Sequence, residues 1–150
     1  MLFAVFIYII VAGSMGGTPY TAETHEVYKD ARCGFQINTT SAWDASHNDT
    51  SCYVSFEKRG KAIIVQVFNN TYSLSEYMSS LGVDSDGIEE NGYGIFDEQA
   101  HATMTVDGTK YYARFLMSHG QGRWYVVTYI SQKSYDSESE NDLLYSFRTI

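Results

Sequence analysis

A chain of 150 residues with 44% hydrophobic and 15% aromatic residues has the size of one ordinary domain and can bury one core. Its 18 acidic and 10 basic residues give a formal net charge of -8, which repels nucleic acid phosphates and anionic lipid head groups. Nucleic acid is therefore excluded as an expected partner.

The apolar run at the start of the chain, Leu2 to Ala12, sets the expected compartment. Its length is that of a signal-peptide core and is too short for an ordinary spanning helix of about 20 residues. No basic residue precedes the run, and its stretch Val5 to Val11 also fits a buried strand or part of a longer anchor. We predict a signal peptide or membrane anchor plus linker over residues 1–24, a folded domain over residues 25–150, and an extracellular or cell-surface location.

Two further features favour export. Cys33 and Cys52 are the only cysteines and flank a polar loop, and two thiolates alone cannot complete a tetrahedral zinc site, so we predict a disulfide. Three glycosylation sequons begin at Asn38, Asn48 and Asn69 on predicted turns. Because sequons also arise by chance in chains rich in Asn and Thr, plain hydrophilic loops remain the alternative.

Strands are predicted throughout the first half of the chain. Glu26 to Asp30 and Gly34 to Asn38 are short strands, the second with its apolar residues on one face. Cys52 to Lys58 and Lys61 to Phe68 form a hairpin around Arg59-Gly60. The second strand of this hairpin is almost continuously apolar, as expected of a central strand covered on both faces.

Two helices are predicted to cover the sheet. Ser73 to Leu81 begins with a serine that is followed three residues later by Glu76, which is a capping box, and Gly82 ends the helix. The acidic stretch Val83 to Gly94 then predicts a loop. Ser134 to Tyr145 is polar at first and apolar at its end, which predicts a second helix with one apolar corner.

A meander of three antiparallel strands is predicted in the second half, because its segments are rich in Thr, Val, Tyr and Phe and are separated by glycine-containing turns. Asp107-Gly108 is a strong hairpin signal, since a type I′ turn needs positive φ at both central residues. Trp124 and Tyr125 should point to opposite, covered faces of the last strand. The strands run from Ala102 to Val106, from Lys110 to Met117 and from Arg123 to Ser131.

A series of landmarks in fixed order runs from about Tyr28 to Phe147. They are GFQI followed by a Trp, KAIIVQVF, SLSEYMSS, an acidic loop, small residues at Ala100 and Ala102, KYYARFLM, RWYVVTYIS and the terminal YSF. This order resembles the Mog1/PsbP-like superfamily, in particular its small exported PsbP-related domains. The resemblance implies an α+β fold in which an antiparallel β-sheet is flanked by helices, an α/β/α sandwich. It also implies a binding or assembly module: plant relatives are extrinsic photosystem subunits, and Mog1 relatives bind a small GTPase.

No catalytic pattern is found in the sequence, since its histidines and acids match no nucleophile elbow, HExxH motif, P-loop or dinucleotide fingerprint. Asp44, His47 and Asp49 could hold a divalent cation, but such loop residues are more often simply hydrated. Asp84-Ser85-Asp86-Gly87 resembles the middle of a calcium loop that lacks its first and last acidic ligands. We therefore expect no enzyme activity, no catalytic residue, no metal site and no cofactor.

The expected function is that of an extracytoplasmic, non-catalytic binding module at the cell surface, with a protein partner and a membrane contact through the N-terminal segment. The alternative is a structural subunit of an extracellular assembly, a homo-oligomer whose apolar N-terminal segment joins neighbours.

The expected partner surface lies at the end of the molecule that carries the tryptophan loop and the acidic loop, because loops on a rigid sheet often carry recognition. The tryptophan is more often a lid over the core edge than a binding anchor. The predicted contact residues are Trp43, Asp84, Asp86, Glu89, Glu90 and Tyr93.

Overall fold

The computed structural model describes residues 25–47, 51–69, 73–81, 88–90, 96–120, 122–133 and 138–150. The predictions on Leu2 to Ala12 lie outside these residues. Within the described part of the chain, no helix is long and apolar enough to cross a membrane.

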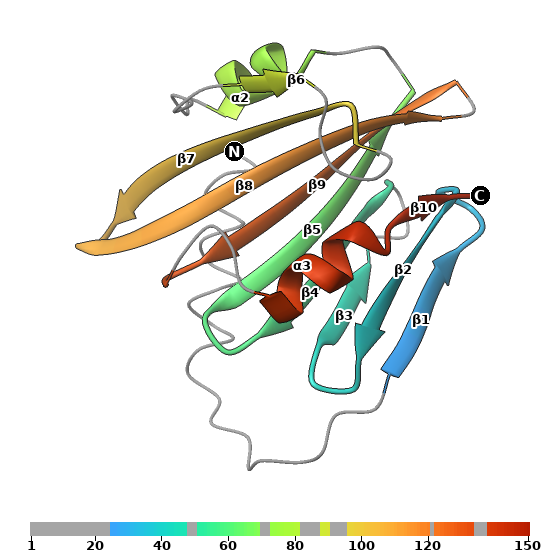
Figure 1. Ribbon diagram of the computed structural model, residues 1–150, viewed down its shortest axis with the longest axis horizontal. Helices are drawn as coiled ribbons and strands as arrows, with labels where there is room; N and C mark the ends of the chain where they lie inside the picture. Colours follow the sequence, from blue (N-terminus) through green and yellow to red (C-terminus); the bar gives the residue numbers. More distant parts are fainter. Residues whose placement is uncertain are drawn as a thin grey trace.

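The described elements are two antiparallel sheets and two short helices (Figure 1). In chain order they are β1 (His25–Asp30), β2 (Phe35–Thr40), β3 (Asp44–His47), β4 (Tyr53–Lys58), β5 (Lys61–Phe68), α2 (Leu74–Leu81), β6 (Ile88–Glu90), β7 (Glu98–Val106), β8 (Thr109–Gly120), β9 (Arg123–Ser131), α3 (Glu138–Tyr145) and β10 (Arg148–Thr149). The large sheet has seven strands in the order β3-β4-β5-β9-β8-β7-β6, and the small sheet has three in the order β1-β2-β10.

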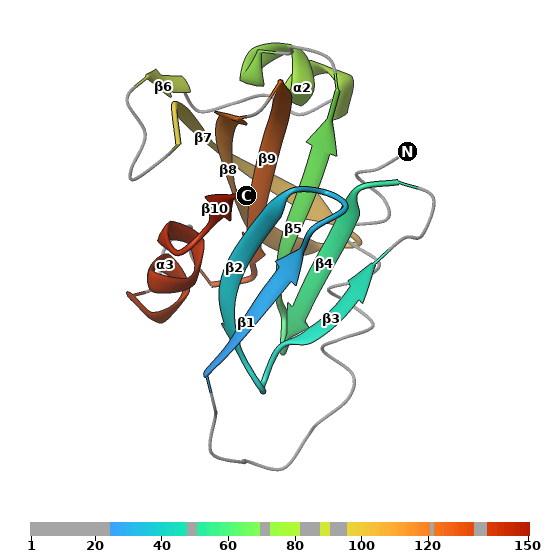
Figure 2. The same ribbon diagram turned by 90° about the vertical axis from the view of Figure 1, so that its right-hand side faces the viewer.

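The predicted α+β sandwich, with an antiparallel sheet flanked by helices, is wrong. Helices α2 and α3 have eight residues each and are about 12 Å long, whereas seven strands spaced by about 4.8 Å span roughly 29 Å. One face of the large sheet is covered instead by the small sheet together with α3 (Figure 2). Phe35 and Ile37 of β2 share a core cluster with Val65 and Val127 of the large sheet. The fold is therefore mainly antiparallel β, in two sheets.

The predicted hairpins are confirmed. Strands β7, β8 and β9 form the meander, and β5 pairs with β4 on one side and β9 on the other. At the β7–β8 turn, Asp107 has φ 51° and Gly108 has φ 81°, as a type I′ turn requires. Residues 62–66 of β5 are all buried, as predicted for a central strand.

Strand β9 sends large side chains into both cores, as predicted. Trp124 is fully buried in the cluster that contains Tyr77 and Met78 of α2. Tyr125 is also fully buried, but it lies in the opposite cluster, where its ring meets Phe147 edge-on at 5.7 Å between centroids. Each face of the large sheet thus has its own hydrophobic core.

The capping box of α2 is confirmed. The backbone N–H of Glu76 donates to the Ser73 Oγ at 3.1 Å, and the Ser73 hydroxyl donates to the Glu76 carboxylate at 3.2 Å. These bonds satisfy one of the free N–H groups at the start of the helix. The helix therefore begins at Leu74 with one of its free N–H groups bonded, and its buried Leu74, Tyr77 and Met78 pack on the core.

Helix α3 is held to the sheet by a buried arginine, which the sequence patterns did not reveal. Arg114 of β8 is 2% exposed, and its guanidinium donates to the Asn141 Oδ1 at 2.7 Å and to the Tyr145 hydroxyl at 2.7 Å. Lys61 adds an ion pair with the buried Glu140 at 3.0 Å. Polar contacts therefore dock a helix whose apolar side is small.

The partly buried Tyr53 should make the protein less stable at alkaline pH. Burial, with a smaller contribution from the charge of Glu57, raises the pKa of Tyr53 to about 12. An unfolded tyrosine titrates near 10, so the stabilisation is fully present below about pH 10 and is lost as the pH rises through about 12. We expect the urea midpoint to fall between pH 8 and pH 11.5, and to fall less in Tyr53→Phe. An equal fall in both proteins would contradict the raised pKa.

Candidate functional site

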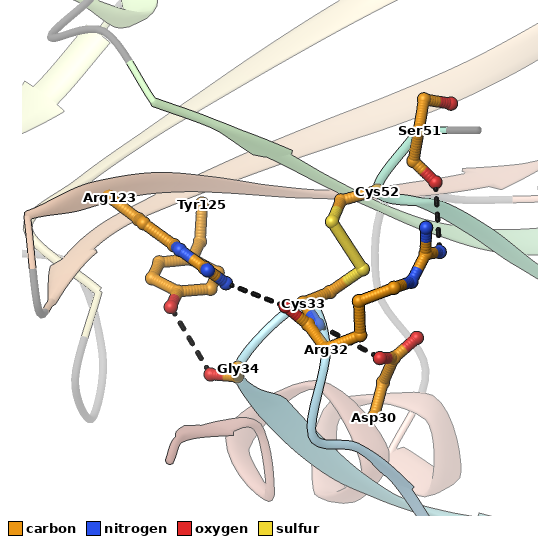
Figure 3. Close-up of a disulfide and its surroundings, with 8 residues drawn as sticks. All are labelled: Asp30, Arg32, Cys33, Gly34, Ser51, Cys52, Arg123 and Tyr125. Carbon is orange, nitrogen blue, oxygen red and sulfur yellow. Dashed lines mark hydrogen bonds between the residues drawn. A yellow bond between two sulfur atoms is a disulfide. The ribbon is translucent and has the colours of Figure 1, made fainter. Parts of the chain in front are cut away.

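The predicted disulfide joins Cys33 to Cys52, with 5.5 Å between the two Cα atoms (Figure 3). It links the turn between β1 and β2 to the residue that precedes β4. The backbone N–H of Cys33 donates to the Asp30 Oδ1 at 2.9 Å, and the Arg32 guanidinium donates to the Ser51 carbonyl at 3.1 Å. The two sheets are thus fastened together at this point by a covalent bond and by hydrogen bonds.

The same turn also fixes the last strands of the chain. The carbonyl of Gly34 accepts hydrogen bonds from the Tyr125 hydroxyl at 3.2 Å and from the Ile150 N–H at 2.9 Å. Gly34 has φ 80°, and a Cβ there would lie 3.1 Å from the Tyr125 hydroxyl oxygen and 3.2 Å from an Arg123 nitrogen. Glycine is therefore required, and the turn positions β2, β9 and β10 as one rigid unit.

The two halves of the predicted partner surface do not lie together. Trp43 is 5% exposed and belongs to the core cluster beneath the small sheet, so it is a lid over the core edge. It precedes β3, which forms one edge of the large sheet, whereas β6 with Glu89 and Glu90 forms the other. Six strand spacings separate these edges, roughly 29 Å. The remaining predicted contact residues, Asp84, Asp86 and Tyr93, lie outside the described residues.

Strand β3 carries two of the three residues that could, from the sequence, bind a divalent cation. Asp44 and His47 are both exposed, and Asp49 lies outside the described residues. In the part of the chain that the structure describes, no group of three His, Cys, Asp or Glu side chains is placed to hold a metal ion.

Two of the three sequon asparagines are described. Asn38 on β2 and Asn69 after β5 are both exposed, and Asn48 lies outside the described residues. Their glycosylation stays a prediction.

The charge of the molecule is concentrated in one part of the chain. Residues 62–109 contain eight of the 18 acidic residues and neither Lys nor Arg, so this stretch alone accounts for the net charge of -8. It includes the edge strand β6, whose pairing with β7 places Glu90 opposite Glu98. Asp97 lies next to this pair, with a side chain that is 56% exposed and 3.1 Å from the Nδ1 of His119. We call Glu89, Glu90, Asp97 and Glu98 the acidic edge.

No protein-family model matches the sequence, and a comparison with curated proteins finds no match. Solved structures do share its fold. A protein of Bacteroides thetaiotaomicron superposes with a TM-score of 0.58 at 11% identity, over 77% of this chain and 45% of that one. The present chain therefore spans less than half the length of that protein.

A second structure identifies the type of fold. The cyanobacterial PsbP protein CyanoP of Synechocystis sp. PCC 6803 superposes with a TM-score of 0.50 at 12% identity, over 92% of this chain and 100% of that one. LpqN of Mycobacterium tuberculosis, described as involved in cell envelope biogenesis, gives a TM-score of 0.43 at 11% identity over 83% of this chain and 85% of that one, which is too low to support an argument. The chain has a PsbP-like fold, and identities this low show the fold alone.

Proposed function

We propose that this PsbP-like domain is a non-catalytic binding module that works outside the cytoplasm and, through its acidic edge, binds a protein partner that presents a basic surface. The observation that carries the proposal is the pairing of Glu90 on the edge strand β6 with Glu98 on its neighbour β7. Like charges directly opposite each other destabilise a strand pair. A cationic group bound between these two carboxylates would reduce the repulsion. Binding would therefore also stabilise the pairing of β6 with β7.

The extracytoplasmic location is supported by the Cys33–Cys52 disulfide, because structural disulfides persist in oxidising compartments. The apolar run Leu2 to Ala12 supports export, because its length is that of a signal-peptide core. We extend the proposal to presentation at the cell surface, membrane contact through this run, and a glycan on the exposed Asn69.

A structural subunit of an extracellular assembly is the second candidate, and the small sheet favours it. Among the described strands, β1 pairs only with β2, and four of its six residues are exposed, so its outer edge could accept a further strand. The donor would be the segment Leu2 to Ala12 of a neighbour. Oligomers that resist SDS would support this candidate, whereas a monomer that requires detergent would support a membrane-anchored module.

The binding proposal is tested by recovering partners from native membranes with two forms of the protein. One has the natural sequence, and the other neutralises the four residues of the acidic edge with Glu89→Gln, Glu90→Gln, Asp97→Asn and Glu98→Gln. The neutralised form should bind at least about fourfold more weakly at low salt, since four charge pairs of ~0.2–1 kcal/mol each are lost. Added salt should weaken binding of the natural form, because charges are screened over about 8 Å at physiological ionic strength.

A matched control removes four exposed carboxylates elsewhere, in Glu26→Gln, Asp44→Asn, Asp107→Asn and Asp142→Asn. It changes the net charge equally and should keep full binding. Equal recovery of the same partners by all three forms at low salt would reduce the acidic edge to a solubilising face.

A further inference from the structure

Four basic residues lie around the disulfide turn, away from the acidic edge. Lys29 of β1 and Arg148 of β10 both lie opposite Gln36 of β2, so they flank it on one face of the small sheet. Arg32 and Arg123 lie on the two sides of the turn itself (Figure 3). Lys29, Arg32 and Arg148 are exposed, and Arg123 is half-buried. We call these four residues the basic corner.

Two arginines of the basic corner, Arg123 and Arg148, bond to neutral backbone groups. Arg123 donates to the Arg32 carbonyl at 3.1 Å, and Arg148 donates to the Tyr145 carbonyl at 2.6 Å. Within the described ranges, no carboxylate forms an ion pair with Lys29, Arg123 or Arg148. Their positive charge is therefore available to an anionic partner.

The surface beside these cations suits a protein contact. Side chains alternate along β1, so His25, Val27 and Lys29 point outward while Glu26 and Asp30 belong to the opposite face. Val27 is 63% exposed, which makes it the only exposed large hydrophobic side chain among the described residues. An apolar side chain close to a cation, on a strand that leads into a turn fixed by a disulfide, binds with little loss of conformational entropy.

We infer that the basic corner binds the acidic edge of a second copy, so that copies associate head to tail. The inference rests on the proposed function, because it names a partner whose basic surface meets the acidic edge. The basic corner and the acidic edge carry opposite charge, whereas two basic corners would repel each other. The contact therefore joins the basic corner of one copy to the acidic edge of the next. β6 and β1 lie in different parts of the molecule (Figure 1), which leaves one surface of each kind open in every pair. Association should therefore continue beyond a dimer as concentration rises.

The test is the mass of the purified full-length protein, measured by light scattering across a concentration series. The natural protein should grow in mass with concentration. Lys29→Glu with Arg148→Glu makes the net charge -12 instead of -8 and should weaken association about tenfold or more. Glu89→Lys with Glu90→Lys makes it -4, which lowers general repulsion, yet should weaken association equally. The protein with all four changes again carries -8 and should regain association, because its two surfaces are complementary once more.

A control with Lys110→Glu and Lys133→Glu reverses two exposed cations outside the basic corner, also gives -12, and should associate as the natural protein does. Far-UV circular dichroism should show that every variant is folded. A monomeric natural protein at all concentrations, or no recovery in the four-change protein, would overturn the inference. In either case, the proposed function would still stand if neutralising the acidic edge abolished capture of another protein from membranes. If neutralisation did not reduce capture, both the proposed function and the inference would fail.

Discussion

Replacing Trp124 with Ala should lower the free energy of unfolding by about 3 to 5 kcal/mol, because a fully buried indole leaves a large cavity. The ring lies 5.3 Å from that of Phe68 and 5.7 Å from that of Tyr77 between centroids, and its N–H donates to the Met117 sulfur. The truncation therefore removes the centre of the core beneath α2. Urea denaturation at pH 7 measures the change.

Val27→Ala is the control, since that side chain is 63% exposed and its truncation should change stability by less than about 0.5 kcal/mol. A loss below about 1 kcal/mol for Trp124→Ala would mean that the indole is exposed and belongs to a binding surface.

Replacing both Cys33 and Cys52 with Ser should lower the free energy of unfolding by about 3 kcal/mol. The disulfide joins two cysteines that are 19 positions apart, and it therefore restricts the unfolded chain. The loss should also loosen the turn whose Gly34 carbonyl binds Tyr125 and Ile150. Urea denaturation with and without reductant measures both effects.

Reductant should lower the stability of the natural protein to that of the double-serine variant and leave the variant unchanged. Two free thiols in the native exported protein, detected by non-reducing mass spectrometry, would contradict the bond.

Local signals made much of the fold predictable. The Asp107-Gly108 turn, the β4–β5 hairpin and the Ser73–Glu76 capping box each depend on residues close together in the chain, and each is confirmed. Strand β3 was missed because its sequence, DASH, has little strand propensity and forms a strand by pairing with β4. The small sheet was missed because β10 and β2 come from opposite ends of the chain.

The candidate site was only partly predictable, for a related reason. Composition revealed the acidic stretch, but the order of strands in the sheet decides its neighbours. That order places Trp43 beside β3 and Glu90 on β6, at opposite edges. The basic corner comes from three parts of the chain, β1 with the turn that follows it, β9 and β10, and no run of basic residues signals it.

The central claim, binding through the acidic edge, is tested most directly by hydrogen–deuterium exchange of the domain alone and bound to the partner recovered from membranes. Exchange should slow at residues 88–90 and 98–100, where β6 pairs with β7, and stay unchanged at Asp44–His47 of β3. Slowed exchange at β3 with no change at β6 and β7 would contradict the claim.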